Sequence, residues 1–357
     1  MDSITTIRKD LFNYAYNNNV PLIATIEIIS GCNFHCVHCY IENESCQQML
    51  SFGQIEQFGN QIIEKGCLYV SLTGGEVMLH PDFIRIYSFF AMRGVCVSVL
   101  SNGSLINDEV ITLFKRFPPK SVEITMYGYT DEVYKRVTGN SSCENVKRVI
   151  SRLKNSGINV LVKMFVTKEN RCDLSLVAQF AKGLSLPFKC DAIIIADRFS
   201  GKKNHELPEN EILDLFGRFS FAEERRKHEE WYTRMHPELD DAFLCGAGRV
   251  SCWLKSNYHL RMCNFLDNSD VDLNCNSFDE AWGWYKTITH RKLPETSKCR
   301  MCENRVFCSY CPALSSVINN DPQMLSSRRI FCDIALVRKC TEQMPDENTP
   351  KEKKHKS

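Results

Sequence analysis

The chain has 357 residues, of which 43% are apolar and 24% charged, which is the composition of a globular protein that can bury a core. Lys and Arg number 44 and Asp and Glu 43, so the net charge of +1 gives no general attraction to nucleic acid or to an anionic membrane. No apolar run approaches the roughly 18 residues of a membrane helix. Residues 1–19 lack the apolar core of a secretory signal, so we expect a cytoplasmic protein with no membrane partner.

Six short apolar runs alternate with longer amphipathic segments between about residues 20 and 200. Because the runs are rich in Val and Ile, they predict buried parallel strands at 22–29, 68–73, 95–100, 121–126, 159–166 and 191–196. Helices are predicted between them at 52–65, 81–93, 108–116, 143–156 and 174–182. Repeated βα units favour a parallel α/β sheet that closes partly, like an incomplete barrel, although an open doubly wound sheet fits the same periodicity.

The pattern changes after about Pro208. A charged helix predicted at 221–235 leads into a region, 245–332, that contains many of the 19 cysteines and few clear strands. Such a region needs a metal or cross-links to hold it together. We therefore expect an N-terminal segment over 1–19, the barrel over 20–235, a small cysteine-rich domain over 236–342 and a disordered tail over 343–357.

Three cysteines follow the first predicted strand, with the spacing Cys32-x3-Cys36-x2-Cys39. Three thiolates on one loop can bind three irons of a 4Fe–4S cluster, which normally takes four cysteines, and leave one iron open to a small molecule. The loop lies at the C-terminal end of a parallel strand, where α/β folds place their active sites. A zinc site completed by His35 or His38 fits the same spacing.

Polar residues and glycines also follow other predicted strands. Gly74-Gly75-Glu76 follows the second strand, Ser101-Asn102-Gly103 the third, and Thr125 ends the fourth. The glycines permit close backbone approach, and the Glu76 carboxylate can accept hydrogen bonds from an ammonium group. Asp197 and Arg198 follow the sixth strand, where they either meet a substrate or form a structural ion pair.

The motifs GCNFHCVHCY, TGGE, SNG and EITMYG, in this order, resemble the radical SAM superfamily over about residues 20–200. The resemblance implies a partial (β/α)6 TIM-like barrel and a 4Fe–4S cluster on Cys32, Cys36 and Cys39, whose open iron chelates S-adenosylmethionine (SAM). It implies that the Gly-Gly-Glu motif binds the amino group of SAM. It implies further cofactor contacts from residues at the strand ends and in the cysteine loop, namely Tyr40, Gly74, Gly75, Glu76, Asn102, Thr125, Lys163 and Asn170.

Eight cysteines in the C-terminal region would satisfy two 4Fe–4S clusters or two structural zinc ions. Their pattern resembles the SPASM extension. This resemblance implies two auxiliary clusters, one on Cys245, Cys252, Cys263 and Cys311, the other on Cys299, Cys302, Cys308 and Cys332. The chain departs from the pattern in two places: Tyr258 stands where glycine is expected, and two residues instead of three separate the last pair, Cys308 and Cys311.

Together the resemblances imply an enzyme that cleaves SAM reductively to a 5′-deoxyadenosyl radical, which takes hydrogen from a peptide substrate. The leading expectation is a maturase that installs a thioether or carbon–carbon cross-link in a ribosomal peptide. It implies three 4Fe–4S clusters, a precursor peptide or protein, and a low-potential electron donor of the flavodoxin or ferredoxin kind. Because Cys32 comes early, we expect no N-terminal peptide-binding domain. Recognition would then come from the barrel, from the cysteine-rich region or from a separate protein.

Two other functions fit parts of the sequence. A sulfatase-type formylglycine maturase would carry an Asp base directly after the cysteine that matches Cys263, but this chain has Asn264 there and only the less well-placed Asp267 nearby. A non-catalytic iron–sulfur or zinc protein for electron transfer would use the same cysteines without cleaving SAM.

Overall fold

Six parallel strands follow one another around the barrel in sequence order. The computed structural model describes residues 3–41, 47–194, 205–218, 241–243, 245–308, 311–313 and 329–342. The strands are β1 (Ile23–Ile29), β2 (Tyr69–Gly74), β3 (Cys96–Ser101), β4 (Ser121–Thr125), β5 (Val160–Phe165) and β6 (Phe188–Asp191). Each pairs in parallel with the next, in the order β6-β5-β4-β3-β2-β1. The order confirms the partial barrel and excludes the doubly wound sheet, in which the first strand lies in the middle.

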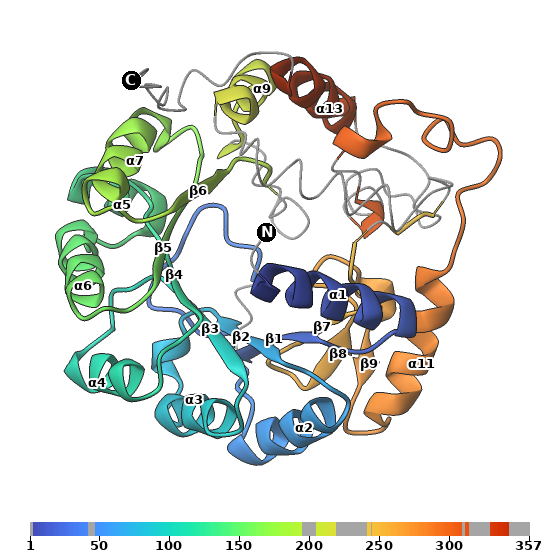
Figure 1. Ribbon diagram of the computed structural model, residues 1–357. Helices are drawn as coiled ribbons and strands as arrows, with labels where there is room; N and C mark the ends of the chain where they lie inside the picture. Colours follow the sequence, from blue (N-terminus) through green and yellow to red (C-terminus); the bar gives the residue numbers. More distant parts are fainter. Residues whose placement is uncertain are drawn as a thin grey trace, which may run out of the picture.

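Helices cover the outer side of the curved sheet (Figure 1). They are α2 (Phe52–Glu64), α3 (Phe83–Ala91), α4 (Asp108–Arg116), α5 (Asp131–Thr138), α6 (Cys143–Asn155) and α7 (Leu174–Gly183). Side-chain caps fix where helices begin: Ser51 and Gln54 form a capping box at α2, and Asn107 accepts a hydrogen bond from Val110 N at α4. The five helices predicted between the strands are found within two residues of their expected ends, and α5 is a helix that we did not predict.

Alternating burial along the strands separates the core from the interior of the barrel. In β4 the side chains of Val122 and Ile124 are fully buried, whereas Glu123 and Thr125 are only half-buried. The register pairs Thr125 with Lys163 on β5, so these polar side chains share the face that lines the barrel interior. The strand sequence therefore supplies an apolar layer beneath the helices and a polar lining inside.

The sixth strand lies earlier in the chain than predicted. We expected it at 191–196, but β6 spans Phe188–Asp191 and pairs with β5 from Val162 to Phe165. The prediction followed the apolar run that begins at Ala192. The paired segment alternates Lys189 and Asp191 with Phe188 and Cys190, so it does not read as a buried strand.

The C-terminal region extends the same sheet. Strand β7 (Ser251–Leu254) pairs in parallel with β1, and β8 (His259–Arg261) and β9 (Val271–Asp272) follow antiparallel. Further along are α11 (Phe278–Thr289), the short helix η5 (Arg305–Phe307) and α13 (Arg329–Glu342), and α13 contacts α9 (Glu209–Arg218). The sequence indicated few clear strands here, because β7, β8 and β9 are only two to four residues long.

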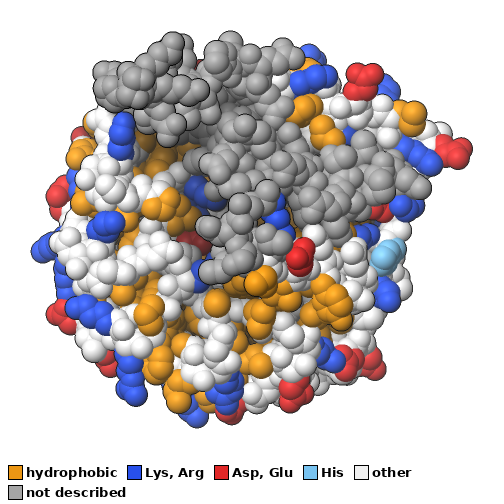
Figure 2. Space-filling model, viewed as in Figure 1, with side chains coloured by type: hydrophobic (Ala, Val, Ile, Leu, Met, Phe, Trp, Pro, Cys, Tyr) orange, Lys and Arg blue, Asp and Glu red, His pale blue; other side chains and the backbone are white. Residues whose placement is uncertain are grey.

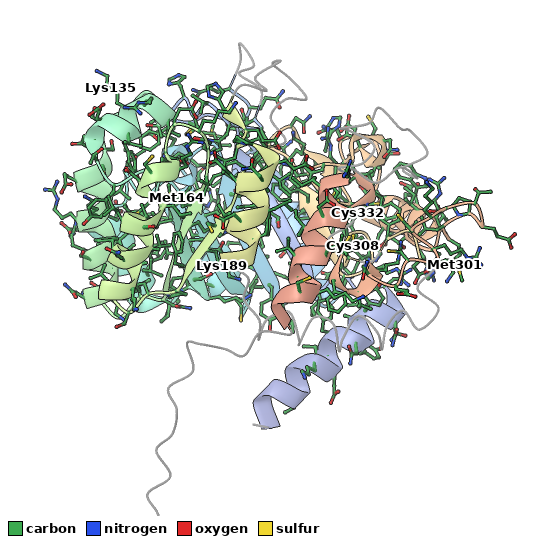
Figure 3. The ribbon with its side chains drawn as sticks, turned by 90° about the horizontal axis from the view of Figure 1, so that it is seen from above. Lys135, Met164, Lys189, Met301, Cys308 and Cys332 are labelled. Atoms are coloured by element: carbon green, nitrogen blue, oxygen red, sulfur yellow. The ribbon has the colours of Figure 1, made fainter. Side chains whose placement is uncertain are left out.

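Helix α1 (Ser3–Asn18) occupies most of the predicted N-terminal segment. Its Ala15 and Tyr16 pack with Leu22 and Val250 beside the start of β1, and the helix projects from one end of the barrel (Figure 3). Positive and negative side chains are mixed around the face drawn in Figure 2, as the net charge of +1 leads us to expect. In the part of the chain that the structure describes, no helix is long and apolar enough to cross a membrane. The predicted helix at 221–235 and the tail at 343–357 lie outside the described residues, and the domain limits stay predictions.

Candidate functional site

The first three cysteines lie on a loop that leaves the C-terminal end of β1 (residues 30–41, the cysteine loop). Backbone hydrogen bonds hold this loop to segments on two sides. Ser30 N donates to Gln48 O at 2.8 Å, and His35 N donates to Thr138 O, at the end of α5, also at 2.8 Å. The loop is therefore anchored at the edge of the sheet where parallel barrels carry their active sites.

Two of the three thiols of the loop, those of Cys32 and Cys36, are partly buried, whereas Cys39 is exposed. Burial raises the pKa of Cys32 to about 11, although the Phe34 N–H donates to its sulfur at 3.4 Å. Burial also raises the pKa of Cys36, a thiolate on Cys39 would raise it further, and the Tyr127 hydroxyl opposes the shift by hydrogen bonding. Without a bound cation the thiols of Cys32 and Cys36 stay protonated at neutral pH, so a metal must displace their protons when it binds.

The two histidines of the loop have other surroundings. His38 stacks on Phe165, with ring centroids 4.7 Å apart and planes 11° apart, and burial lowers its pKa to about 4. His35 is exposed. Among the residues placed by the structure, no three His, Cys, Asp or Glu side chains converge closely enough to hold a single metal ion. The three thiols of the loop supply the kind of donor by which proteins hold iron–sulfur clusters.

The Gly-Gly pair lets the β2 turn pack against the backbone of the cysteine loop. A Cβ atom on Gly74 would lie 2.2 Å from Ile29 O, and one on Gly75 would lie 2.2 Å from Gly31 O. The same approach allows Gly75 N to donate to Ile29 O at 2.8 Å and Glu76 N to donate to Gly31 O at 2.9 Å. Gly74 also has φ +155. Both positions therefore require glycine for the loop to lie where it does.

Glu76 is buried between β2 and β3. Its Oε1 accepts from Ser101 Oγ at 2.8 Å and from Met78 N at 3.2 Å, and its Oε2 accepts from Asn102 N at 2.7 Å. Burial raises its pKa, while these three donors oppose the shift. A carboxylate has about four acceptor sites, so Oε2 keeps capacity for a further donor.

Asn102 connects this carboxylate to the cysteine loop. Its Nδ2 donates to Asn33 Oδ1 at 2.8 Å and lies 3.9 Å from Cys32 Sγ. Its Oδ1 accepts from Ser104 Oγ at 2.7 Å, and Asn33 in turn donates to Ser104 Oγ at 2.9 Å. The second and third strand ends and the cysteine loop thus form one hydrogen-bonded unit, in which Asn33 and Ser104 were not predicted.

Thr125 and Lys163 lie side by side on the interior face, as their register requires. Lys163 is paired with Glu123, which lies two residues before Thr125 on the same strand. Asn170, which was also expected to contact the cofactor, hydrogen-bonds to backbone atoms. Its Nδ2 donates to Tyr127 O and Phe165 O, both at 2.9 Å, and its Oδ1 accepts from Thr167 N at 2.7 Å. Asn170 therefore ties the ends of β4 and β5 together.

A buried carboxylate near Tyr40 was missed by the sequence reasoning. Glu27, on β1, is 1% exposed; its Oε1 accepts from Ser256 Oγ at 2.8 Å, while its Oε2 is buried and has no hydrogen-bond partner among the described residues. The Tyr40 hydroxyl is hydrogen-bonded to Thr73, and burial raises its pKa, with the charge on Glu27 adding to the shift. The only signal in the sequence was one acidic residue inside the apolar run Ile23–Ile29. The weak candidates Asp197 and Arg198 lie outside the described residues.

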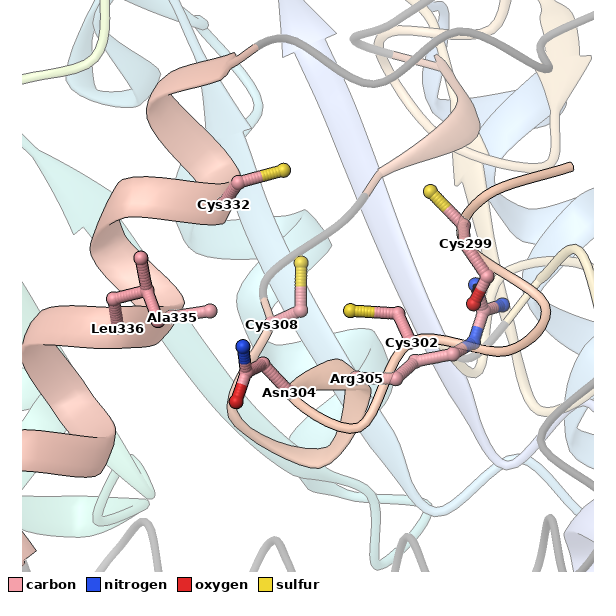
Figure 4. Close-up of a pocket in the computed structure, with 8 residues that line it drawn as sticks. All are labelled: Cys299, Cys302, Asn304, Arg305, Cys308, Cys332, Ala335 and Leu336. Carbon is pink, nitrogen blue, oxygen red and sulfur yellow. Dashed lines mark hydrogen bonds between the residues drawn. The ribbon is translucent and has the colours of Figure 1, made fainter.

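Four of the C-terminal cysteines surround one cavity of about 80 Å³. Cys308 and Cys332, the latter on α13, lie near each other beside the barrel (Figure 3), and the four sulfur atoms point toward a common space (Figure 4). The buried Arg305 lines the same cavity and donates to Cys299 O at 3.2 Å. We call these residues the four-cysteine set: Cys299, Cys302, Cys308 and Cys332.

The remaining C-terminal cysteines divide into two groups. Burial raises the pKa of Cys263 to about 12, and thiolates on Cys311 and Cys245 would raise it further, so these three thiols interact electrostatically. We call them the three-cysteine set. Cys252 lies instead in the buried core, beside Cys67.

Comparisons with known proteins agree with this fold and site. Residues 26–181 match the sequence model of the Radical SAM superfamily. The subtilosin biosynthesis protein AlbA of Bacillus subtilis is 28% identical over 68% of this chain, and the match spans only 55% of AlbA. The mycofactocin maturase MftC of Mycobacterium ulcerans is 23% identical over 85% of this chain and 86% of its own length. The structure of Streptococcus suis SuiB bound to its precursor peptide SuiA covers 92% of this chain and 80% of SuiB, with a TM-score of 0.69 and 14% identity.

The fold and the cysteine loop thus define an enzyme of the partial TIM-barrel class with a cysteine-rich C-terminal region. Residues 26–181 match the radical SAM superfamily, and the chain is related over most of its length to the SPASM maturases. As such it uses SAM and a SAM-binding 4Fe–4S cluster. This similarity favours an enzyme over the non-catalytic alternative.

Proposed function

We propose that this enzyme abstracts hydrogen from a peptide and cross-links that peptide through a thioether or carbon–carbon bond. The observation that carries the proposal is the unit formed by the cysteine loop, Glu76 and Asn102 at the C-terminal ends of β1, β2 and β3. Cys32, Cys36 and Cys39 would hold the SAM-binding cluster. When bound, that cluster supplies the electron that splits SAM into methionine and a 5′-deoxyadenosyl radical.

The residues around the loop would bind SAM and exclude water. Glu76, already positioned by Ser101 and Asn102, has acceptor capacity left for the ammonium group of SAM. Tyr40 would cover the cofactor, and Thr125 and Lys163 would contact it from the interior face. Because Lys163 forms an ion pair with Glu123, its ammonium group is held at one position on the interior face of the barrel.

The cysteine-rich region would hold two auxiliary clusters that relay electrons between the site and a flavodoxin-like or ferredoxin-like donor. The chemistry of the donor set supports this for the four-cysteine set, since four thiols and one arginine line a single cavity. Arg305 would offset part of the negative charge that four thiolates bring.

A peptide substrate is supported by the relatives. AlbA is described as a biosynthesis protein for a bacteriocin, MftC as a maturase, and SuiB was solved with a precursor peptide. Asn264, which is a neutral amide, cannot act as the base of a formylglycine maturase, so we do not propose that reaction. Peptide recognition would come from the barrel, the cysteine-rich region or a separate protein.

The test is an anaerobic incubation of the protein with SAM, a reductant and short cysteine-containing peptides encoded beside its gene. We expect one peptide to lose two hydrogens, measured as its mass, together with release of 5′-deoxyadenosine. Peptides whose masses stay unchanged, while SAM is cleaved at the same rate with and without them, would contradict peptide cross-linking.

A further inference from the structure

Glu27 projects from the face of β1 that lines the interior of the barrel. The register follows one face of the sheet from Glu123 on β4, across β3, to Ser71 and Thr73 on β2, and Thr73 lies opposite Glu27. Because side chains alternate along a strand, residues connected in this way share the same face. Glu27 therefore shares the interior face with the ion pair of Glu123 and Lys163, on the strand that leads into the cysteine loop.

The carboxylate of Glu27 is buried, yet only one of its two oxygens is hydrogen-bonded. Oε1 accepts from Ser256 Oγ at 2.8 Å, and Oε2 has no partner among the described residues, although Glu27 is 1% exposed. Glu27 also forms no ion pair with any residue that the structure describes, whereas the charge of Glu123 is matched by Lys163. A buried carboxylate that lacks a paired charge and a donor costs stability. Proteins keep such destabilising groups where function requires them.

The interior face beside Glu27 is accessible to solvent on the side of β7. Trp253 on β7 lies opposite Thr25, two residues before Glu27, so its ring lies on the same face. Thr25, Ser71 and Trp253 are only half-buried, which leaves this part of the interior open to a ligand. The Trp253 Nε1 atom is itself buried and has no acceptor among the described residues. One acceptor and one donor without partners thus belong to the same face.

We propose that Glu27 binds the cationic side chain of a Lys or Arg residue in the peptide substrate, and that Trp253 Nε1 donates to a carbonyl of the same peptide. This inference rests on the proposed function, whose substrate class it narrows. A cation with N–H groups supplies both things that Glu27 lacks, a positive charge and a donor for Oε2. Glu76 already takes the one ammonium group of SAM in the proposed function, which leaves Glu27 for a second cation.

The first test measures the thermal unfolding midpoint of the anaerobically prepared protein in excess SAM, so that Glu76 is occupied. The probe is n-butylammonium chloride, which carries the end of a lysine side chain. Its controls are tetramethylammonium chloride, a cation without N–H groups, and acetamide, a neutral N–H donor. We expect only butylammonium to raise the midpoint of the wild type saturably. An equal rise with either control, or no rise with butylammonium, would overturn the inference.

Two variants assign the response to Glu27. Glu27→Gln should not respond to butylammonium, while the control Glu64→Gln, which removes an exposed carboxylate of α2, should respond as the wild type does. Without amine, Glu27→Gln should unfold at a higher temperature than the wild type, because the buried charge without a partner is gone. A midpoint below that of the wild type, or an undiminished response to butylammonium, would mean that Glu27 is only structural.

A further measurement needs no variant and covers the case in which Glu27→Gln does not fold. In a crystal structure of the wild type with SAM and n-butylammonium, we expect the ammonium group within hydrogen-bond distance of Glu27 Oε2. A different position for the amine, at the concentration that saturates the thermal shift, would overturn the inference.

The peptide itself is tested by binding, which does not require turnover. Fluorescein-labelled peptides encoded beside the gene are titrated with the protein and SAM, and compared with versions in which norleucine replaces each Lys and Arg. We expect one replacement to weaken binding at least about tenfold, or ~1.4 kcal/mol. Peptides that bind equally well after every replacement would overturn the inference. Butylammonium bound at Glu27 without binding of any peptide would instead overturn the proposed peptide substrate, and with it the peptide as the source of the cation.

Discussion

Glycine at two successive positions connects the sequence of this site directly to its geometry. Gly74 and Gly75 lie against main-chain oxygens of the cysteine loop, so even a methyl group there would meet backbone that cannot move aside without moving the cysteines. The Gly-Gly pair could be predicted from the sequence as a close approach. The atoms it approaches could not, because they belong to a loop more than 40 residues earlier in the chain.

The substitution Gly75→Ala tests this role. The added Cβ would stand 2.2 Å from Gly31 O, so we expect the cysteine loop to shift and SAM cleavage to fall at least about tenfold, or ~1.4 kcal/mol in the barrier. Iron content and 5′-deoxyadenosine release are measured together. Gly183→Ala is the control, because a Cβ at Gly183 meets no atom within 4 Å. Equal activity in both variants would show that the close approach is not required.

Other site residues could be recognised from the sequence only where the signal that marks them is local. Cys32, Cys36 and Cys39 were recognisable because their spacing is a signal within ten residues. Asn33, Ser104 and Glu27 were not, because their significance lies in contacts with distant segments. The ligand roles of the cysteines and the SAM contacts of Tyr40, Glu76 and Lys163 stay predictions.

At the scale of elements, strands β1 to β5, which lie in runs rich in Val, Ile and Leu, were found correctly, and β6 was not. Its alternating Lys189 and Asp191 hide it from a search for apolar runs. The β7–β8 hairpin was missed for a different reason: strands this short are stabilised by pairing with β1 and by burial, which sequence periodicity does not show.

Tyr258 explains how the chain tolerates the loss of an expected glycine in that hairpin. It adopts φ +66, a left-handed conformation that costs about 1–2 kcal/mol, yet its ring is 3% exposed. Truncating a buried aromatic ring costs about 3–5 kcal/mol, so Tyr258→Gly should lower the free energy of unfolding by about 1–4 kcal/mol in spite of the relieved strain. Denaturant unfolding measures this. If Tyr258→Gly is more stable than the wild type, the buried ring does not compensate for the strained backbone.

A pH-dependent contribution is expected from the β8–β9 segment. Partial burial raises the pKa of Asp270, but hydrogen bonds from Arg261 and His259 outweigh burial and hold this pKa below its usual value. A lowered folded-state pKa stabilises the fold above the unfolded value of about 4, and the stabilisation is lost as the pH falls through the folded value.

Asp270→Asn should therefore destabilise the protein at pH 7 and differ less and less from the wild type as the pH falls below about 4. Unfolding midpoints of the two proteins, measured across this range, provide the test. A difference that does not depend on pH would mean that the Asp270 carboxylate contributes through packing alone.

At the scale of the whole molecule, the cysteine-rich region is joined to the barrel by β7, which pairs with β1, the strand that leads into the cysteine loop. The sequence predicted a partial barrel followed by a cysteine-rich region, and the structure confirms both. The resemblance implied the set of Cys299, Cys302, Cys308 and Cys332 that lines one cavity. The buried position of Cys252 could not be predicted, because it depends on the strand register of β7 with β1.

Replacement of one residue of the four-cysteine set should remove iron from the cysteine-rich region without unfolding the barrel. We expect Cys302→Ala to lower the iron content by about one cluster while the barrel stays folded, because Cys302 is not one of the residues that pack in the hydrophobic core. Iron analysis and circular dichroism measure the two effects. Unchanged iron content would refute an auxiliary cluster at this cavity.

The most direct test of the account is the metal and SAM chemistry of the cysteine loop. Protein prepared anaerobically is analysed for iron, sulfide and zinc, and 5′-deoxyadenosine release upon reduction with SAM is compared between the wild type and Cys36→Ala. We predict iron and sulfide in the wild type and a fall in release of at least about a hundredfold in the variant, or ~3 kcal/mol in the barrier. Zinc in place of iron, or equal release from the two proteins, would contradict the account.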